Sequence, residues 1–193
     1  IQDKQPADFA LMTSKNEFDK HDINFYRVQI TNEVQTLNDL ANGGVNVVDF
    51  QPRVQAVACY KYPDKTCAGF LMRWITDPIE VQDFSAADPD LKASREKLMT
   101  EFPNDVKPLP NLDARLDLIK SDARCAAAKN TQADFLKIAS FEAKHYYIAD
   151  LQGFLLPDGH FLVMDPGKGD KKGPGRSTQE ALKTLEAYIK AHC

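Results

Sequence analysis

One short stretch near the end of the chain limits the folds that are open to it. Apolar runs at 154–156 and 161–164 flank a Pro-Asp-Gly tripeptide at 157–159. An Asp-Gly pair between two apolar runs is a strong signal for a tight turn between antiparallel strands. The sequence therefore predicts a β-hairpin late in the chain, which opens at His145 and closes at Asp165.

Apolar residues repeat every three or four positions elsewhere, which predicts helices before and after the hairpin. The predicted helices are 22–42, 88–102, 112–128, one capped by Thr131, and one from Ser177. Gly43 and Gly44 follow the first helix, as expected at a helix end, and residues 177–180 form a capping-box pattern. The predicted fold class is α+β, in a single domain over 1–193 with a candidate N-terminal arm over 1–20.

Three shorter segments carry weaker signals. Residues 45–50 are a β-branched run, which predicts a short strand. The alternation over 26–30 leaves a strand open as a competing interpretation of that region. Residues 54–62 fit a strand or a helix equally well.

Composition and charge narrow the class of protein. The chain has 193 residues, of which 43% are hydrophobic and 27% charged, and its net charge is −4. This is the composition of a globular chain rather than a disordered one. No apolar run approaches the roughly 18–20 residues of a membrane span, and the acidic balance argues against a general nucleic-acid binder. We therefore expect no nucleic-acid partner and no membrane span.

The cysteines bear on the compartment of the protein. There are four, Cys59, Cys67, Cys125 and Cys193, and they allow three complete pairings. Two disulfides would suit a secreted or periplasmic protein, whereas a cytosolic chain could carry four thiols. The terminal position of Cys193 favours its pairing with another cysteine. The CxxC spacing of zinc sites is absent, so we expect no metal and no cofactor.

The segment 65–75 carries the candidate chemistry. Four of its residues are spaced as one face of a helix: Cys67, Leu71, Trp74 and Ile75. With Thr66 as N-cap, Cys67 would lie in the first turn, where the helix dipole and free backbone N–H groups favour a thiolate. A thiolate nucleophile needs a base, usually histidine, held in turn by a carboxylate or amide. His145 and Asp165, at the two open ends of the predicted hairpin, would supply this pair.

The order of these residues resembles that of papain-like cysteine peptidases. The string Cys-Ala-Gly-Phe-Leu-Met-Arg-Trp-Ile is similar to that of the YopT/AvrPphB-type bacterial effector peptidases, whose nucleophile precedes a helix with a Trp. The resemblance covers residues 65–75 and 145–166. It implies a papain-like arrangement, with a nucleophile helix packed on an antiparallel sheet, and a protein delivered into another cell. It also implies Cys67 as nucleophile, His145 as base and Asp165 as the residue that orients the base, with a protein or peptide as substrate.

Two alternatives stay open within this interpretation. A two-residue turn at 157–158 would place Asp170 opposite His145, so Asp170 is a second candidate for the orienting carboxylate unless a bulge shifts the register. Cys67 can instead form a disulfide with Cys59. The second hypothesis is accordingly a non-catalytic secreted or periplasmic protein, held by two disulfides, that binds a protein partner as an inhibitor or immunity protein does.

The residues around and after the hairpin are assigned to the surface. His160 lies beside the turn and is expected to be exposed. The stretch 166–176 holds four glycines and four basic residues but lacks the Walker pattern of phosphate-binding loops. It predicts a flexible surface loop. The functional alternatives are a flap beside the active site and an anion site at the N-terminus of the last helix.

Overall fold

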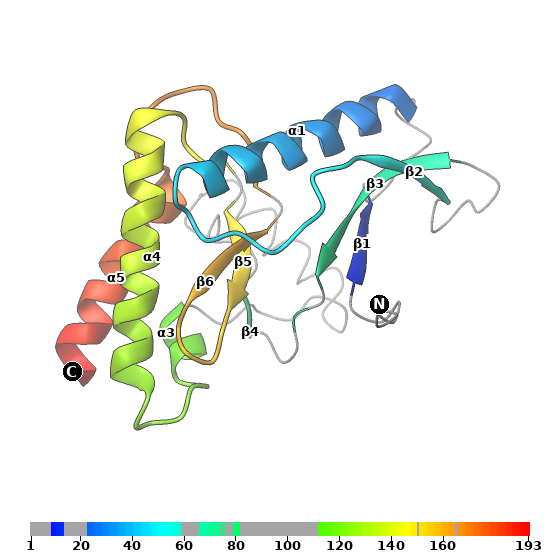
Figure 1. The fold of residues 1–193 in the computed structure, drawn as a ribbon. Helices are drawn as coiled ribbons and strands as arrows, with labels where there is room; N and C mark the ends of the chain where they lie inside the picture. Colours follow the sequence, from blue (N-terminus) through cyan, green and yellow to red (C-terminus); the bar gives the residue numbers. More distant parts are fainter. Residues whose placement is uncertain are drawn as a thin grey trace, which may run out of the picture.

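The computed structural model describes residues 9–13, 23–58, 66–73, 75, 79–81, 112–149, 151–164 and 166–193. Their elements are, in chain order, β1 (Phe9–Thr13), α1 (Ile23–Asn42), β2 (Gln55–Ala58), β3 (Thr66–Arg73), β4 (Ile79–Val81), α3 (Leu112–Leu116), α4 (Arg124–Lys144), β5 (Gln152–Leu155), β6 (Phe161–Met164) and α5 (Arg176–His192) (Figure 1). The α+β class is confirmed. The predicted helix at 88–102 lies outside the described residues.

The strands form two antiparallel sheets of three strands, in the orders β1-β3-β2 and β4-β5-β6. The segment 45–50 connects the two sheets. The Val48 N–H donates to the carbonyl of Val163 in β6 at 3.1 Å, and the Arg73 N–H in β3 donates to the carbonyl of Asp49 at 2.7 Å. The strand predicted over 45–50 is therefore an extended linker with isolated bridges, and it holds both sheets in one fold.

The described residues enclose two apolar clusters. One lies between α1 and β3, where it consists of Ile30, Val34, Leu37, Val48, Ala68, Phe70, Met72 and Met164. The larger one lies between α4, α5 and the β5–β6 hairpin, and Phe135, Phe161 and Leu185 are fully buried in it. Each such side chain stabilises the fold by about 1.5–3 kcal/mol through removal of apolar surface from water. Among the helices that the structure describes, none is long and apolar enough to cross a bilayer.

The first predicted helix is confirmed, and α1 ends at the two glycines as expected. Gly44 has a positive φ of 80°, and the Val45 N–H returns to the carbonyl of Leu40 at 3.0 Å. This is the geometry of a glycine-terminated helix. The competing strand over 26–30 is thereby excluded.

The helix predicted over 67–75 is wrong, because residues 67–73 belong to strand β3. The burial pattern explains the difference. Ala68, Phe70 and Met72 are buried at alternate positions, whereas Leu71 is only partly covered; Gly69 is also buried but has no side chain. Alternating burial has the period of two that a strand requires, and β3 pairs with a strand on each side. Tertiary pairing therefore overrides the helical spacing of the same sequence.

The helix predicted over 112–128 is also wrong, because the chain breaks it into α3 and α4. The Arg124 Nε–H donates to the carbonyl of Ile119 at 2.8 Å and so closes the turn between the two helices. Thr131 does not cap a helix, since α4 runs through it from Arg124 to Lys144. Thr131 is fully buried in the middle of α4.

The predicted hairpin is confirmed, with Leu155 paired to Phe161 and Gln152 to Met164 across the turn at 157–159. Its strands are shorter than expected. β5 begins at Gln152, so His145 lies seven residues before the hairpin and not at its open end.

Candidate functional site

Two of the three residues of the predicted thiol-peptidase site are described by the structure, and they lie on different elements. Cys67 is in β3, paired with Val57 of β2, so the predicted helix N-terminus around it is wrong. His145 directly follows α4, exposed, with its ring stacked on that of Phe141 at a centroid distance of 4.7 Å. Asp165 lies outside the described residues. The catalytic roles of all three residues stay predictions.

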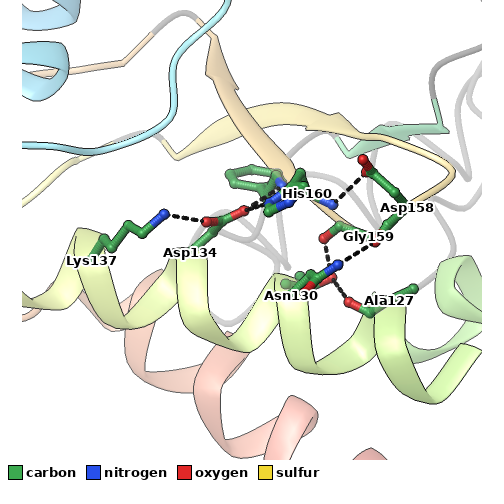
Figure 2. A network of polar contacts seen from close by, with 9 residues as sticks. Ala127, Asn130, Asp134, Lys137, Asp158, Gly159 and His160 are labelled. Atoms are coloured by element: carbon green, nitrogen blue, oxygen red, sulfur yellow. Dashed lines mark hydrogen bonds and ion pairs between the residues drawn. The ribbon is translucent and has the colours of Figure 1, made fainter.

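The turn of the hairpin is bound to the middle of α4 by side chains of that helix (Figure 2). The Asn130 side-chain amide donates to the carbonyl of Asp158 at 2.8 Å. The Thr131 hydroxyl lies 2.6 Å from the carbonyl of Gly159, to which it donates. Gly159 has a φ of 85° and sits so close to α4 that a Cβ atom there would overlap the backbone of Ala127. Only glycine therefore fits this position without displacement.

Asp134 joins the hairpin to α4 beside these contacts. Its buried carboxylate accepts from Nδ1 of His160 at 2.9 Å, from Nζ of Lys137 at 2.9 Å and from the backbone N–H of Phe161 at 3.1 Å (Figure 2). Burial alone would raise the pKa of this carboxyl, but the three hydrogen bonds outweigh burial and hold the pKa below its ordinary value of 3.8. Asp134 is therefore ionised at neutral pH and attaches the hairpin by charge-assisted hydrogen bonds.

The pair of His160 and Asp134 has the form of an imidazole oriented by a carboxylate. Because a carboxylate only accepts, Nδ1 carries a proton, and Nε2 of a neutral ring is an acceptor. The side chain of His160, which the sequence predicts to be exposed, is 43% exposed, and the residue as a whole is half-buried. The contacts of His160 and Asp134 run within the hairpin and α4, which makes the pair an anchor for the turn.

Glu142 is a second buried carboxylate of α4, near its C-terminal end. Its Oε1 accepts from the N–H of Ile148 at 2.8 Å, and its Oε2 accepts from the N–H of Gly175 at 2.9 Å. Gly175 is the N-cap of α5, so the capping box predicted at 177–180 is wrong. Glu142 places a carboxylate at the N-terminus of α5, the position of the anion site predicted as a functional alternative for the loop 166–176. Burial raises the pKa of Glu142 above its ordinary value of 4.5, against the opposing effect of the two backbone hydrogen bonds.

Sequence reasoning identifies neither Asp134 nor Glu142. Asp134 directly precedes the core residue Phe135 of α4, and Glu142 directly follows the core residue Phe141. An acidic residue next to the apolar positions of a helix indicates a buried carboxylate, and a buried carboxylate needs hydrogen-bond donors nearby. The donors come from the hairpin and from the start of α5, which helical spacing alone cannot identify.

The glycine-rich loop 166–176 is bound along its backbone to the segment that follows α4. The N–H of Gly169 donates to the carbonyl of Tyr147 at 2.8 Å, and the N–H of Tyr147 donates to the carbonyl of Lys171 at 3.0 Å. In contrast to the flexible loop that we predicted, these bonds hold it against the end of α4. Asp170, the second candidate for the orienting carboxylate, is exposed on this loop.

A disulfide joins the two long helices of the larger cluster. It connects Cys125, in the first turn of α4, with Cys193, directly after α5, across 68 residues of sequence and with 5.5 Å between the Cα atoms. The two helices lie side by side in opposite directions (Figure 1). The expectation that Cys193 is paired is confirmed.

In comparisons with known proteins, no protein-family model and no curated protein matches the chain.

Proposed function

We propose that this chain is a disulfide-stabilised domain of an oxidising compartment, secreted or periplasmic, that binds a protein partner without catalysing a reaction. The observation that carries the proposal is the disulfide between Cys125 and Cys193. Stable disulfides form in oxidising compartments and are rare in the cytosol. A bridge that closes a loop of 68 residues stabilises the folded chain outside the cell, where reducing systems are absent.

The use of the buried polar groups supports the same function. Asp134 and Glu142 are both buried, and each binds backbone N–H groups of segments that follow α4 in the sequence. Their hydrogen-bonding capacity holds loops in place rather than facing a substrate. A rigid scaffold with fixed loops suits binding, because little conformational entropy is lost when the partner docks.

The competing proposal is a papain-like thiol hydrolase or acyl transferase, most simply a secreted or injected effector peptidase. It rests on the resemblance of two sequence patches, and it requires Cys67 to be a free thiolate with His145 as its base. The position of Cys67 in β3 removes the helix dipole from the forces that would favour a thiolate there. The binding proposal has Cys67 in a disulfide, whereas the hydrolase proposal needs it as a free thiolate. The two proposals therefore make opposite statements about the oxidation state of Cys67.

The oxidation state is tested by alkylating the unreduced chain, unfolded and native in parallel, and mapping the labelled cysteines by mass spectrometry. We expect a peptide linked through Cys125 and Cys193 and no label on Cys67. Rapid labelling of Cys67 in the native protein below pH 7, abolished in C67S, would overturn the binding proposal. Peptidase assays of C67A and H145A would then follow.

Partner binding is tested with the purified, oxidised domain as bait in the secreted or periplasmic fraction. A captured protein counts as a partner only if, once purified, it binds the domain saturably and with fixed stoichiometry. The reduced variant C125S/C193S is the matched control for dependence on the folded, cross-linked domain. Turnover of the captured protein by the domain would contradict the proposal.

A further inference from the structure

We infer that the exposed cations of the loop 166–176, together with Lys144, form the surface on which an acidic segment of a protein partner docks, a conclusion that rests on the proposed function. The loop contains four basic residues and one acidic residue, in a chain whose net charge is −4. Lys168, Lys171, Lys172 and Arg176 are all exposed. With four basic residues and one acidic residue the loop is locally positive, and a local excess of positive charge attracts anionic groups.

Backbone contacts place Lys144 beside the loop. The N–H of Gly173 donates to the carbonyl of Glu142 at 2.9 Å, and the N–H of Tyr147 donates to the carbonyl of Lys171 at 3.0 Å. Lys144 lies between Glu142 and Tyr147 in the sequence and is exposed. Its charge therefore adds to that of the loop. The loop lies at the end of the α4–α5 pair opposite to the C-terminus (Figure 1).

The loop is preorganised for binding. Gly169 packs against the ring of Tyr147, and Gly175 packs against the Glu142 side chain, so closely that a Cβ atom would strike either neighbour. Together with the backbone hydrogen bonds, these contacts fix the positions from which the cations project. A surface ordered before binding loses less entropy on association than a flexible loop does.

The cations are available to a partner. Among the described residues, none of the four loop cations is ion-paired with a carboxylate. Lys168 lies over the ring of Tyr146, with Nζ 4.5 Å from the ring centroid. The remaining side chains, those of Lys171, Lys172 and Arg176, can pair with the carboxylates of a partner and steer its approach.

An acidic protein segment fits this surface better than a nucleic acid does. Single-stranded nucleic acids bind by stacking bases on open aromatic rings. The Tyr146 ring is covered by Lys168 and packs edge-on against Phe141 at 5.3 Å, and its hydroxyl donates to Asp39 at 2.9 Å. The Tyr147 ring is in contact with Gly169. Neither ring is open to stacking, and the net negative charge of the chain opposes a long polyanion.

A lipid surface fits less well too, because stable membrane association of a basic surface needs apolar side chains or a lipid anchor beside it. The exposed large apolar side chains in the described part of the chain are Val28, Leu118 and Leu136. None of them belongs to the loop or to the segment that it contacts.

The test is a titration of the oxidised full chain with a fluorescein-labelled peptide of alternating Glu and Ser, at an ionic strength of about 0.05 M, where surface charges act over more than 10 Å. The variant K171E/K172E/R176E reverses three of the four positive charges of the loop and leaves Lys168 in place. The matched control K120E/K129E/K183E makes the same change in net charge at exposed lysines elsewhere on α4, α5 and the turn before α4. Circular dichroism of both variants verifies that they are folded.

We expect the loop variant to weaken peptide binding by about tenfold or more and the control variant to change it by about twofold or less. Equal losses in the two variants, or no peptide binding by the wild-type chain, would overturn the inference. So would binding of a heparin fragment, single-stranded DNA or phosphatidylserine vesicles in preference to the peptide. Cysteine mapping distinguishes failure of this inference from failure of the proposed function. If the chain is oxidised but does not bind the peptide, only the docking surface is refuted. If Cys67 is a free, reactive thiol, the proposed function itself is refuted.

Discussion

The Nδ1 atom of His160 lies 2.9 Å from the Oδ2 atom of Asp134, and this contact joins the tip of the β5–β6 hairpin to the middle of α4. The same Oδ2 atom accepts from the backbone N–H of Phe161 at 3.1 Å. Eight residues further along α4, Glu142 binds the start of α5 in a similar way. Two buried carboxylates of one helix therefore position the segments that follow it.

Replacement of Asp134 by asparagine should destabilise the protein. D134N keeps the shape of the side chain but removes the charge that His160, Lys137 and the Phe161 N–H all bind. Loss of hydrogen bonds to a buried charged group costs about 1–3 kcal/mol. Urea denaturation of D134N against the control E186Q, at an exposed position of α5, measures the difference. Equal stability of the two variants would contradict the anchoring role.

The cost of D134N should also depend on pH. The pKa of Asp134 is lowered in the folded protein, so its stabilising contribution is present above the ordinary value of 3.8 and is lost as pH falls through the lower folded-state pKa. The stability difference between wild type and D134N should therefore shrink below pH 3.8. Denaturation midpoints of both proteins, measured from about pH 2 to about pH 6 so that the range spans the ordinary carboxyl pKa, give this difference. A difference that grows with acidification would refute the assignment.

Glu142 should show the opposite sign. Burial raises its pKa in the folded state, so its contribution is fully present below the ordinary value of 4.5 and is lost as pH rises through the higher folded-state pKa. The stability of wild type relative to E142Q should therefore fall as pH rises above 4.5. Parallel denaturation series of wild type, E142Q and E186Q test this. A constant difference across the range would show that Glu142 ionises as freely in the folded chain as in the unfolded one.

Loss of the disulfide should lower stability substantially. The bridge closes a loop of 68 residues, and removal of the restraint from the unfolded chain costs about 2–4 kcal/mol. We expect C125A/C193A to unfold at a lower urea concentration than the oxidised wild type. Addition of a reducing agent to the wild type should reproduce most of this shift. If C125A/C193A matches the oxidised wild type, the bridge does not restrain the chain in solution.

Substitution of Gly159 by alanine should be more damaging than substitution of Gly44. Both glycines have positive φ angles, 85° and 80°, so alanine strains the backbone at either site by about 1 kcal/mol. A Cβ atom at Gly159 also overlaps the backbone of Ala127, whereas a Cβ atom at Gly44 has none of the described residues within contact distance. G159A should therefore cost about 1–3 kcal/mol more than G44A through displacement of the turn. Thermal unfolding of both variants provides the comparison, and equal losses would exclude close contact between the turn and α4.

Local signals in the sequence determined the elements whose geometry needs only neighbouring residues. The apolar spacing of 22–42 and its two glycines predict α1 with its end, because helix periodicity and C-capping are local properties. The Asp-Gly turn predicts the β5–β6 hairpin for the same reason. The α+β class follows from these elements together.

Tertiary structure alone decided the rest, because it depends on partners far away in the sequence. Cys67 has helical spacing to its neighbours, but two flanking strands pair with β3 and make it extended. His145 follows α4 instead of opening the hairpin, and His160, which lies beside the turn as expected, is held by Asp134, 26 residues earlier. A buried carboxylate is stable only where folding brings donors to it. The donors of Asp134 and Glu142 lie on segments that no local pattern connects to α4.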